Sequence, residues 1–179
     1  MQRLNVEIKA ICRDPEWVRN ALLSRNANFI GEDHQVDTYF QVNQGRLKLR
    51  EGKIEHALIH YNRPNQTGPK ASDVLLYHPE LGSSLKPILT RALGVLTVVD
   101  KKRSIFFIDN VKFHIDRLEG WGNFVEIEAI DMDGSHDRQE LLAQCRKYMA
   151  ILNIAEEDLL EDSYSDMILS RQLEKDSHS

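Results

Sequence analysis

Charged and apolar residues alternate along much of this chain, and the charges are sorted by segment. In the stretch NVEIKA (Asn5–Ala10), Glu7 and Lys9 would share one face of a β-strand, with Val6 and Ile8 on the other. Successive side chains of a strand point to opposite faces, so such a segment has one apolar face and one charged face. The pattern therefore predicts a sheet with an apolar side and a charged side.

The sign of the charge changes between segments. GRLKLRE, ALIHYNR and VVDKKRSIF carry cations on one face, KFHID carries Lys112, His114 and Asp116 on one face, and FVEIEAI carries two carboxylates. Solvated sheet faces usually mix both signs, because opposite charges on neighbouring strands attract, so sorted charges indicate a binding surface. The charged faces present Lys9, Lys48, Arg50, Arg63, Lys101 and Arg103 as cations, and Glu7, Asp116, Glu126 and Glu128 as carboxylates. Lys101 is preferred to Lys102 for its spacing from Arg103, a choice that a register slip of one residue would reverse.

Helical periodicity separates these strands and indicates an α+β fold. Helices are predicted within residues 14–25, 83–94 and 137–152, with a last short helix within residues 156–169. The predicted strands are Arg3–Ile11, Gln35–Val42, Arg46–Arg50, His56–Arg63, Ser72–Tyr77, Leu96–Ile108, Val111–Leu118 and Phe124–Ile130. Amphipathic helices need an apolar sheet face to cover. If they cover the outside of an antiparallel sheet closed into a barrel, the charges point inward.

The charge inventory predicts a ligand for this interior. Buried charges need partners, and the cations suit a polyanion such as a triphosphate. The carboxylates suit Mg²⁺ or Mn²⁺, ions that also contact phosphates. The chain has no P-loop sequence, which excludes a Walker-type nucleotide site.

Composition limits the binding partners and the cellular location that we expect for this chain. The 179 residues carry a formal net charge of −5, which argues against broad binding of nucleic acid or anionic membranes. The two cysteines, Cys12 and Cys145, lack metal-site spacing and are expected to be reduced thiols. With no membrane span or signal peptide in the sequence, we expect a cytoplasmic protein. A single domain is expected over residues 1–170, followed by a polar tail at residues 171–179.

The charged segments resemble, in order, the motifs of the CYTH superfamily, also called the triphosphate tunnel metalloenzymes. NVEIK resembles the E-x-E-x-K strand that opens the family, with Asn5 where the first glutamate would stand. GRLKLRE, LIHYNRP and VVDKKRSIF resemble its basic strands, and HIDRLEGWGNFVEIEA resembles its closing hairpin. The resemblance covers about residues 3 to 169 and implies a closed barrel of about eight antiparallel strands.

The resemblance also implies roles for the inward charges. The triphosphate would be bound by the six cations Lys9, Lys48, Arg50, Arg63, Lys101 and Arg103. Three of these would also act in catalysis: Lys9, Arg63 and Arg103. Mg²⁺ or Mn²⁺ would be held by the carboxylates Glu7, Asp116, Glu126 and Glu128. The expected partner is a small triphosphate such as ATP, inorganic triphosphate or thiamine triphosphate. A homodimer is suggested by the resemblance alone. His114 shares the face of Asp116 and is expected to be a hydrogen-bonded structural histidine.

Three functions remain open at this point. The residue sequences of these motifs are most similar to those of class IV adenylyl cyclases, which convert ATP to cyclic AMP and pyrophosphate. A triphosphate hydrolase would use the same residues on a different substrate. A binding module without turnover is favoured only by Asn5, because an amide oxygen is a weaker metal ligand than a carboxylate.

Overall fold

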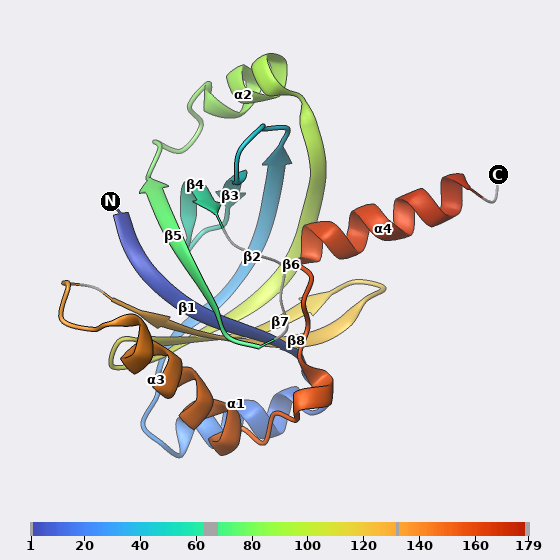
Figure 1. Ribbon diagram of the computed structural model, residues 1–179. Coiled ribbons are helices and arrows are strands. Elements are labelled where there is room, and N and C mark those ends of the chain that lie inside the picture. The colour runs from blue at the N-terminus through green and yellow to red at the C-terminus, as the bar shows by residue number, and fades with distance from the viewer. Residues whose placement is uncertain (1, 63–67, 132, 178–179) are drawn as a thin grey trace.

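Eight antiparallel strands close into a barrel in the computed structural model, which describes residues 2–62, 68–131 and 133–177. The strands lie around the barrel in the order β1-β5-β4-β3-β2-β6-β7-β8 (Figure 1). Their bounds are β1 Gln2–Ile11, β2 Asn28–Phe40, β3 Arg46–Glu51, β4 His56–Asn62, β5 Lys70–Tyr77, β6 Val95–Ile108, β7 Val111–Leu118 and β8 Gly122–Ile130. The predicted fold class and the predicted closure are both confirmed.

The longest strands, β2 and β6, pair along nearly their whole length. β2 begins at Asn28, well before the predicted start at Gln35, because its first half pairs with the second half of β6. A register irregularity between Phe29 and Gly31 interrupts this pairing. The irregularity breaks the strict alternation in the sequence, which explains why the early part of the strand was not predicted.

The apolar core lies outside the barrel wall, between the strands and two helices. α1 (Pro15–Leu23) and α3 (Arg138–Ile151) cover the outer faces of β1, β7 and β8 (Figure 1). Val6 and Ile8 of β1 are buried there, on the side opposite to Glu7 and Lys9. The predicted inversion, with charges inside and apolar residues outside, is therefore present on this half of the barrel.

Each helix in this layer begins at a defined cap. The Asp14 side chain accepts a hydrogen bond from the backbone amide of Trp17, and Pro15 occupies the first turn of α1. α3 begins with a capping box between Asp137 and Glu140. These caps satisfy backbone amides that would otherwise lack partners at the helix starts.

The other two helices lie away from this core. α2 (Leu85–Leu93) lies beyond one end of the barrel and buries no residue, and Ile88 is 58% exposed. α4 (Tyr164–Asp176) follows a short 3₁₀ turn at Glu156–Asp158 and continues to Asp176. Residues 171–176, expected in a polar tail, are therefore helical, because good helix formers follow the capping box at Ser163 and Asp166. Both cysteines are free and buried, and none of the described helices is long and apolar enough to span a membrane.

Packing of α3 on the barrel is testable at Phe113. Its ring is fully buried and makes an edge contact with Tyr148 of α3, with 4.8 Å between ring centroids. We expect Phe113→Ala to lower the free energy of unfolding by about 3–5 kcal/mol, measured by urea denaturation. Ile88→Ala on exposed α2 is the control and should change it by less than about 0.5 kcal/mol. Equal, small losses in both variants would contradict this core.

Candidate active site in the tunnel

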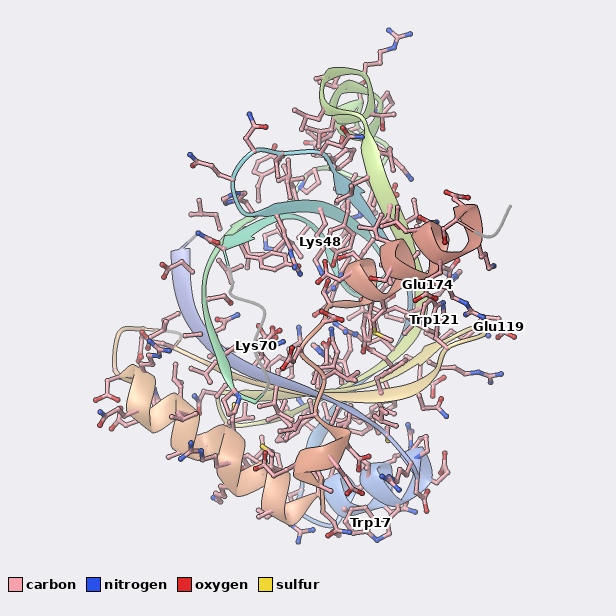
Figure 2. All side chains as sticks on the ribbon, turned by 45° about the vertical axis from the view of Figure 1, so that its right-hand side comes forward. Trp17, Lys48, Lys70, Glu119, Trp121 and Glu174 are labelled. Carbon is pink, nitrogen blue, oxygen red and sulfur yellow. The ribbon has the colours of Figure 1, made fainter. Side chains whose placement is uncertain are left out.

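The barrel encloses a cavity of about 460 Å³, which we call the tunnel. Figure 2 shows the Lys48 side chain inside the ring of strands, whereas Trp17 of α1 lies outside it. Most of the residues chosen from the sequence line this cavity: Glu7, Lys9, Lys48, Arg50, Lys101, Arg103, Glu126 and Glu128. Arg63 lies outside the residues that the structure describes, so its predicted role stays a prediction.

Three cations converge on the carboxylate of Asp37, which is buried in the wall of the tunnel. Arg50 donates to both Asp37 oxygens, at 2.8 and 2.9 Å. Lys48 Nζ and Lys101 Nζ contact Asp37 Oδ2 at 3.0 and 2.8 Å. Burial alone would favour the neutral acid, but Arg50, Lys101 and Lys48 hold the Asp37 pKa well below its usual range. Asp37 is not among the site residues chosen from the sequence.

Lys101 is the most deeply buried cation of this group. It is 2% exposed, whereas Lys102 is exposed, so Lys101 and not Lys102 lies on the inner face of β6. Burial, reinforced by the nearby charges of Arg50 and Arg103, lowers the Lys101 pKa to about 7 although Asp37 acts in the opposite direction. Lys101 therefore changes charge near neutral pH.

Arg103 and Asp116 form a second buried pair. Arg103 Nε and Nη2 donate to the two Asp116 oxygens at 2.6 and 2.5 Å. The Tyr164 hydroxyl, from the start of α4, donates to Asp116 Oδ2 at 2.7 Å. Asp116 is fully buried and does not line the tunnel cavity. This geometry favours a positioning role for Asp116, which orients Arg103, over the metal-ligand role that the resemblance implies.

Glu126 is held by three donors. Lys9 Nζ lies 3.3 Å from Oε1, while Arg103 Nη2 and His114 Nδ1 lie 2.7 and 3.0 Å from Oε2. Burial opposes ionisation of Glu126, but Arg103, Lys9 and His114 keep its pKa well below the usual range. Lys9 also lies over the Tyr164 ring, 3.8 Å from the centroid. The expected hydrogen bond of His114 is therefore present.

Glu55 is a tunnel residue that sequence reasoning missed. It accepts from Arg50 Nη1 and Gln35 Nε2, both at 2.9 Å, and also pairs with Lys112. Glu55 lies in the β3–β4 connection, outside every alternating segment, so no periodic signal could identify it. Asp33 folds this connection inward by accepting from the backbone amides of residues 53, 54 and 55.

Glu7 and Glu128 face each other across the β1–β8 pair. They are direct neighbours in the register, and both line the tunnel. Asn5 lies beside them and donates through Nδ2 to Glu128 Oε1. The Asn5 Oδ1 atom is buried and has no hydrogen-bond partner among the described residues. Two carboxylates and an amide oxygen thus line neighbouring positions of the wall, and such oxygen donors suit a hard divalent cation.

The wall formed by β4 and β5 is mostly apolar where it lines the cavity, with His56, Tyr61 and Ser72 as its polar side chains. Ala57 and Ile59 of β4 and Val74 and Leu76 of β5 line the tunnel, and Ile59 is directly opposite Leu76 in the register. Ile59 and Ala57 also pair with Lys48 and Arg50 of β3. Cationic and apolar surfaces are therefore adjacent inside the barrel, a feature that the charge pattern did not predict.

A second acidic group lies outside the tunnel, in the β8–α3 connection. Asp131, Asp133 and His136 place one potential ligand atom each within 4.8 Å of one another. However, Asp131 accepts from the backbone amide of Gly134, and Asp133 accepts from that of Ser135. The two carboxylates therefore already serve to hold the backbone of this connection in place, which accounts for their proximity.

Several solved structures share this fold. A protein of Pyrococcus horikoshii OT3 has a TM-score of 0.74 at 22% identity, covering 90% of this chain and 98% of its own. A Vibrio parahaemolyticus protein provisionally described as an adenylate cyclase has a TM-score of 0.70 at 18% identity, covering 93% and 98%. A Hippeastrum protein, provisionally named an adenylyl cyclase and described as having a dominant triphosphatase activity, has a TM-score of 0.59 at 10% identity, covering 95% of each chain.

These identities show a common fold and leave the specific activity open. Among curated proteins, no relative matches the chain significantly. The CYTH domain profile matches residues 3–164, which is most of the chain. Together with the closed eight-stranded barrel and its charged tunnel, this match shows that the chain belongs to the CYTH family.

Proposed function

We propose that this chain is a metal-dependent enzyme that converts ATP to cyclic AMP and pyrophosphate in the tunnel. The observation that carries the proposal is the convergence of Lys48, Arg50 and Lys101 in one wall. In the strand order, the basic strand β3 lies opposite β8, which carries Glu126 and Glu128. A triphosphate between these walls would meet cations on one side and metal-binding carboxylates on the other.

Asp37 and Asp116 prepare the cations for this ligand. Arg50 is fixed by two hydrogen bonds to Asp37, and Arg103 by two to Asp116, so neither guanidinium has to be ordered when the substrate binds. Pre-ordered cations stabilise the charge that develops on phosphate oxygens in the transition state more effectively than mobile ones. Lys9 and Arg103, both beside Glu126, are the cations that we assign to the reacting phosphate.

The metal ion is assigned to the carboxylates that line the cavity. Glu7 and Glu128 are cross-strand neighbours in the wall. The Oδ1 atom of Asn5, on the same strand as Glu7, is an acceptor without a hydrogen-bond partner among the described residues, and a bound cation would satisfy it. Mg²⁺ or Mn²⁺ held there would polarise phosphate oxygens and lower the pKa of the attacking hydroxyl. Glu126 borders the same position from the side of His114.

The apolar wall favours an organic triphosphate over inorganic triphosphate. Inorganic triphosphate is charged along its whole length and gains nothing from Ile59, Val74 and Leu76. A nucleoside can cover such a surface while its phosphates reach the adjacent cations of β3. In the proposed reaction the ribose 3′-hydroxyl attacks the α-phosphorus, the bond to the β-phosphate oxygen breaks, and pyrophosphate leaves.

Hydrolysis of a triphosphate is the second candidate. It is favoured by the low pKa of Lys101, because a lysine that is partly neutral near pH 7 can accept a proton from an attacking water. The fold shared with the Hippeastrum protein described as a triphosphatase points in the same direction. The reaction products decide between the two candidates.

Incubation of the protein with Mn²⁺ or Mg²⁺ and ATP should yield cyclic AMP and pyrophosphate, measured by chromatography. We expect Arg50→Ala to lower kcat/KM about a hundredfold or more. Lys102→Ala, on the outer face of the same barrel, is the control and should retain full activity. Release of phosphate without cyclic AMP would support hydrolysis, and metal-dependent binding without product would support a binding module. Full activity of Arg50→Ala would contradict the tunnel site.

Binding of triphosphate should take up a proton at Lys101. The free lysine is mostly neutral at pH 8, about one unit above its pKa, and a bound polyanion would favour the ammonium form. Calorimetry of inorganic triphosphate in two buffers of different ionisation enthalpy measures this uptake. Affinity should fall as pH rises above about 7. Lys101→Arg, which stays charged, should show less proton uptake at pH 8. Equal uptake by both proteins would rule out this role.

A further inference from the structure

Tyr164 brings the first turn of α4 into the wall of the tunnel. α4 begins with the capping box between Ser163 and Asp166, and both Ser163 and Tyr164 line the cavity. The Tyr164 side chain is 4% exposed, although the rest of the helix extends away from the barrel (Figure 1). A side chain from outside the barrel therefore belongs to the lining of the proposed site.

The chain on either side of Tyr164 is attached to the barrel. Before it, the backbone amide of Leu160 donates to the backbone oxygen of Lys9 at 2.9 Å. After it, Asp166 accepts a hydrogen bond from Arg46 of β3 at 2.8 Å. Because these contacts join the start of α4 to β1 and β3, the barrel itself determines where the Tyr164 side chain lies.

The hydroxyl of Tyr164 adds a third hydrogen bond to Asp116. It donates to Asp116 Oδ2 at 2.7 Å, and the same oxygen accepts from Arg103 Nη2 at 2.5 Å. Arg103 Nε donates to the other Asp116 oxygen at 2.6 Å. Three donors fix the orientation of the carboxylate, and the guanidinium of Arg103 is fixed with it. Without the hydroxyl, Asp116 could rotate and move Arg103 from this position.

The ring of Tyr164 contacts the other cation that we assign to the reacting phosphate, Lys9. Lys9 Nζ lies 3.8 Å from the ring centroid and 3.3 Å from Glu126 Oε1. An ammonium is attracted to the face of an aromatic ring, most strongly where water is excluded. Phe124 packs against the same ring, with 5.2 Å between the two centroids. The ring and Glu126 therefore fix the position of the Lys9 ammonium together.

We propose that Tyr164 is a positioning residue for the reaction in the tunnel. Its hydroxyl orients Arg103 through Asp116, and its ring holds the ammonium of Lys9. This inference rests on the proposed function for the assignment of Lys9 and Arg103 to the reacting phosphate. A tyrosine with a purely structural role would act through its packing against Phe124, a contact that a phenylalanine also makes.

The proposed role predicts an effect on kcat rather than on KM. Lys48, Arg50 and Lys101 are fixed by Asp37, so they would still bind the substrate in the absence of the Tyr164 hydroxyl. Misplacement of Arg103 would remove an interaction that strengthens as charge develops on the reacting phosphate. A loss of that kind lowers kcat and leaves KM nearly unchanged.

Tyr164→Phe tests the hydroxyl, because this variant retains the ring and its packing. With ATP and Mn²⁺ we expect kcat to fall about ten- to a hundredfold while KM changes by less than about threefold. Tyr148→Phe is the matched control, since Tyr148 is also buried but packs against Phe113 outside the barrel, and its kcat should be unchanged. Circular dichroism should show that both variants are folded. Full kcat in Tyr164→Phe would overturn the inference and leave the proposed function standing.

Tyr164→Leu also removes the ring, and we expect it to lower kcat about tenfold further. A Tyr164→Leu variant no slower than Tyr164→Phe would overturn the role of the ring in holding Lys9.

A double-mutant cycle separates orientation of Arg103 from a general loss of packing. Arg103→Lys retains the charge but cannot make the paired hydrogen bonds that orient a guanidinium. Adding Tyr164→Phe to this variant should therefore change kcat by less than about threefold. The same loss of kcat in both backgrounds would overturn the inference. If Arg103→Lys fails to fold, the comparison of Tyr164→Phe with Tyr148→Phe still decides. A wild-type protein that forms no product would instead overturn the proposed function, and the inference with it.

Discussion

The ion pairing of Asp37 with Arg50, Lys48 and Lys101 is the interaction on which the tunnel depends. A barrel with charges inside is stable only if those charges meet partners, since an uncompensated buried charge costs about 3–5 kcal/mol. Asp37 lies on β2 and pairs with cations of β3 and β6, the strands on either side of it. Arg103 of β6 pairs in turn with Asp116 of β7 and Glu126 of β8. The pairing that stabilises the tunnel also fixes the cations in position for a polyanion.

The barrel also has apolar surfaces, one on its outside and one inside the tunnel. Outside, β1, β7 and β8 bury their apolar faces under α1 and α3, and this layer holds the acidic strands in register. Inside, Ile59, Val74 and Leu76 give the wall of β4 and β5 a mostly apolar lining next to the basic strand. The tunnel therefore combines a basic wall, an acidic wall and an apolar wall. Such a cavity is matched to a ligand that carries both a polyphosphate and an organic group.

The sequence predicted those parts of the site that follow from strand periodicity. Lys48, Arg50, Lys101, Arg103, Glu126 and Glu128 lie on the inner face because every second residue of a strand must point the same way. Glu55 could not be found by this argument, because an irregular connection places it. The contact of Tyr164 with Asp116 joins a helix to a strand far away in the sequence, and side-chain conformation decides it. The convergence on Asp37 is likewise a consequence of which strands become neighbours.

The central claim is that the inward charges form the binding site for a triphosphate. A crystal structure of the protein with Mn²⁺ and a non-hydrolysable ATP analogue tests it most directly, because anomalous scattering locates the metal independently. We predict phosphate oxygens in contact with Lys48, Arg50 and Arg103, and the metal beside Glu7 and Glu128. A tunnel that remains free of the analogue at saturating concentration, with the nucleotide bound on the outer surface, would contradict the account.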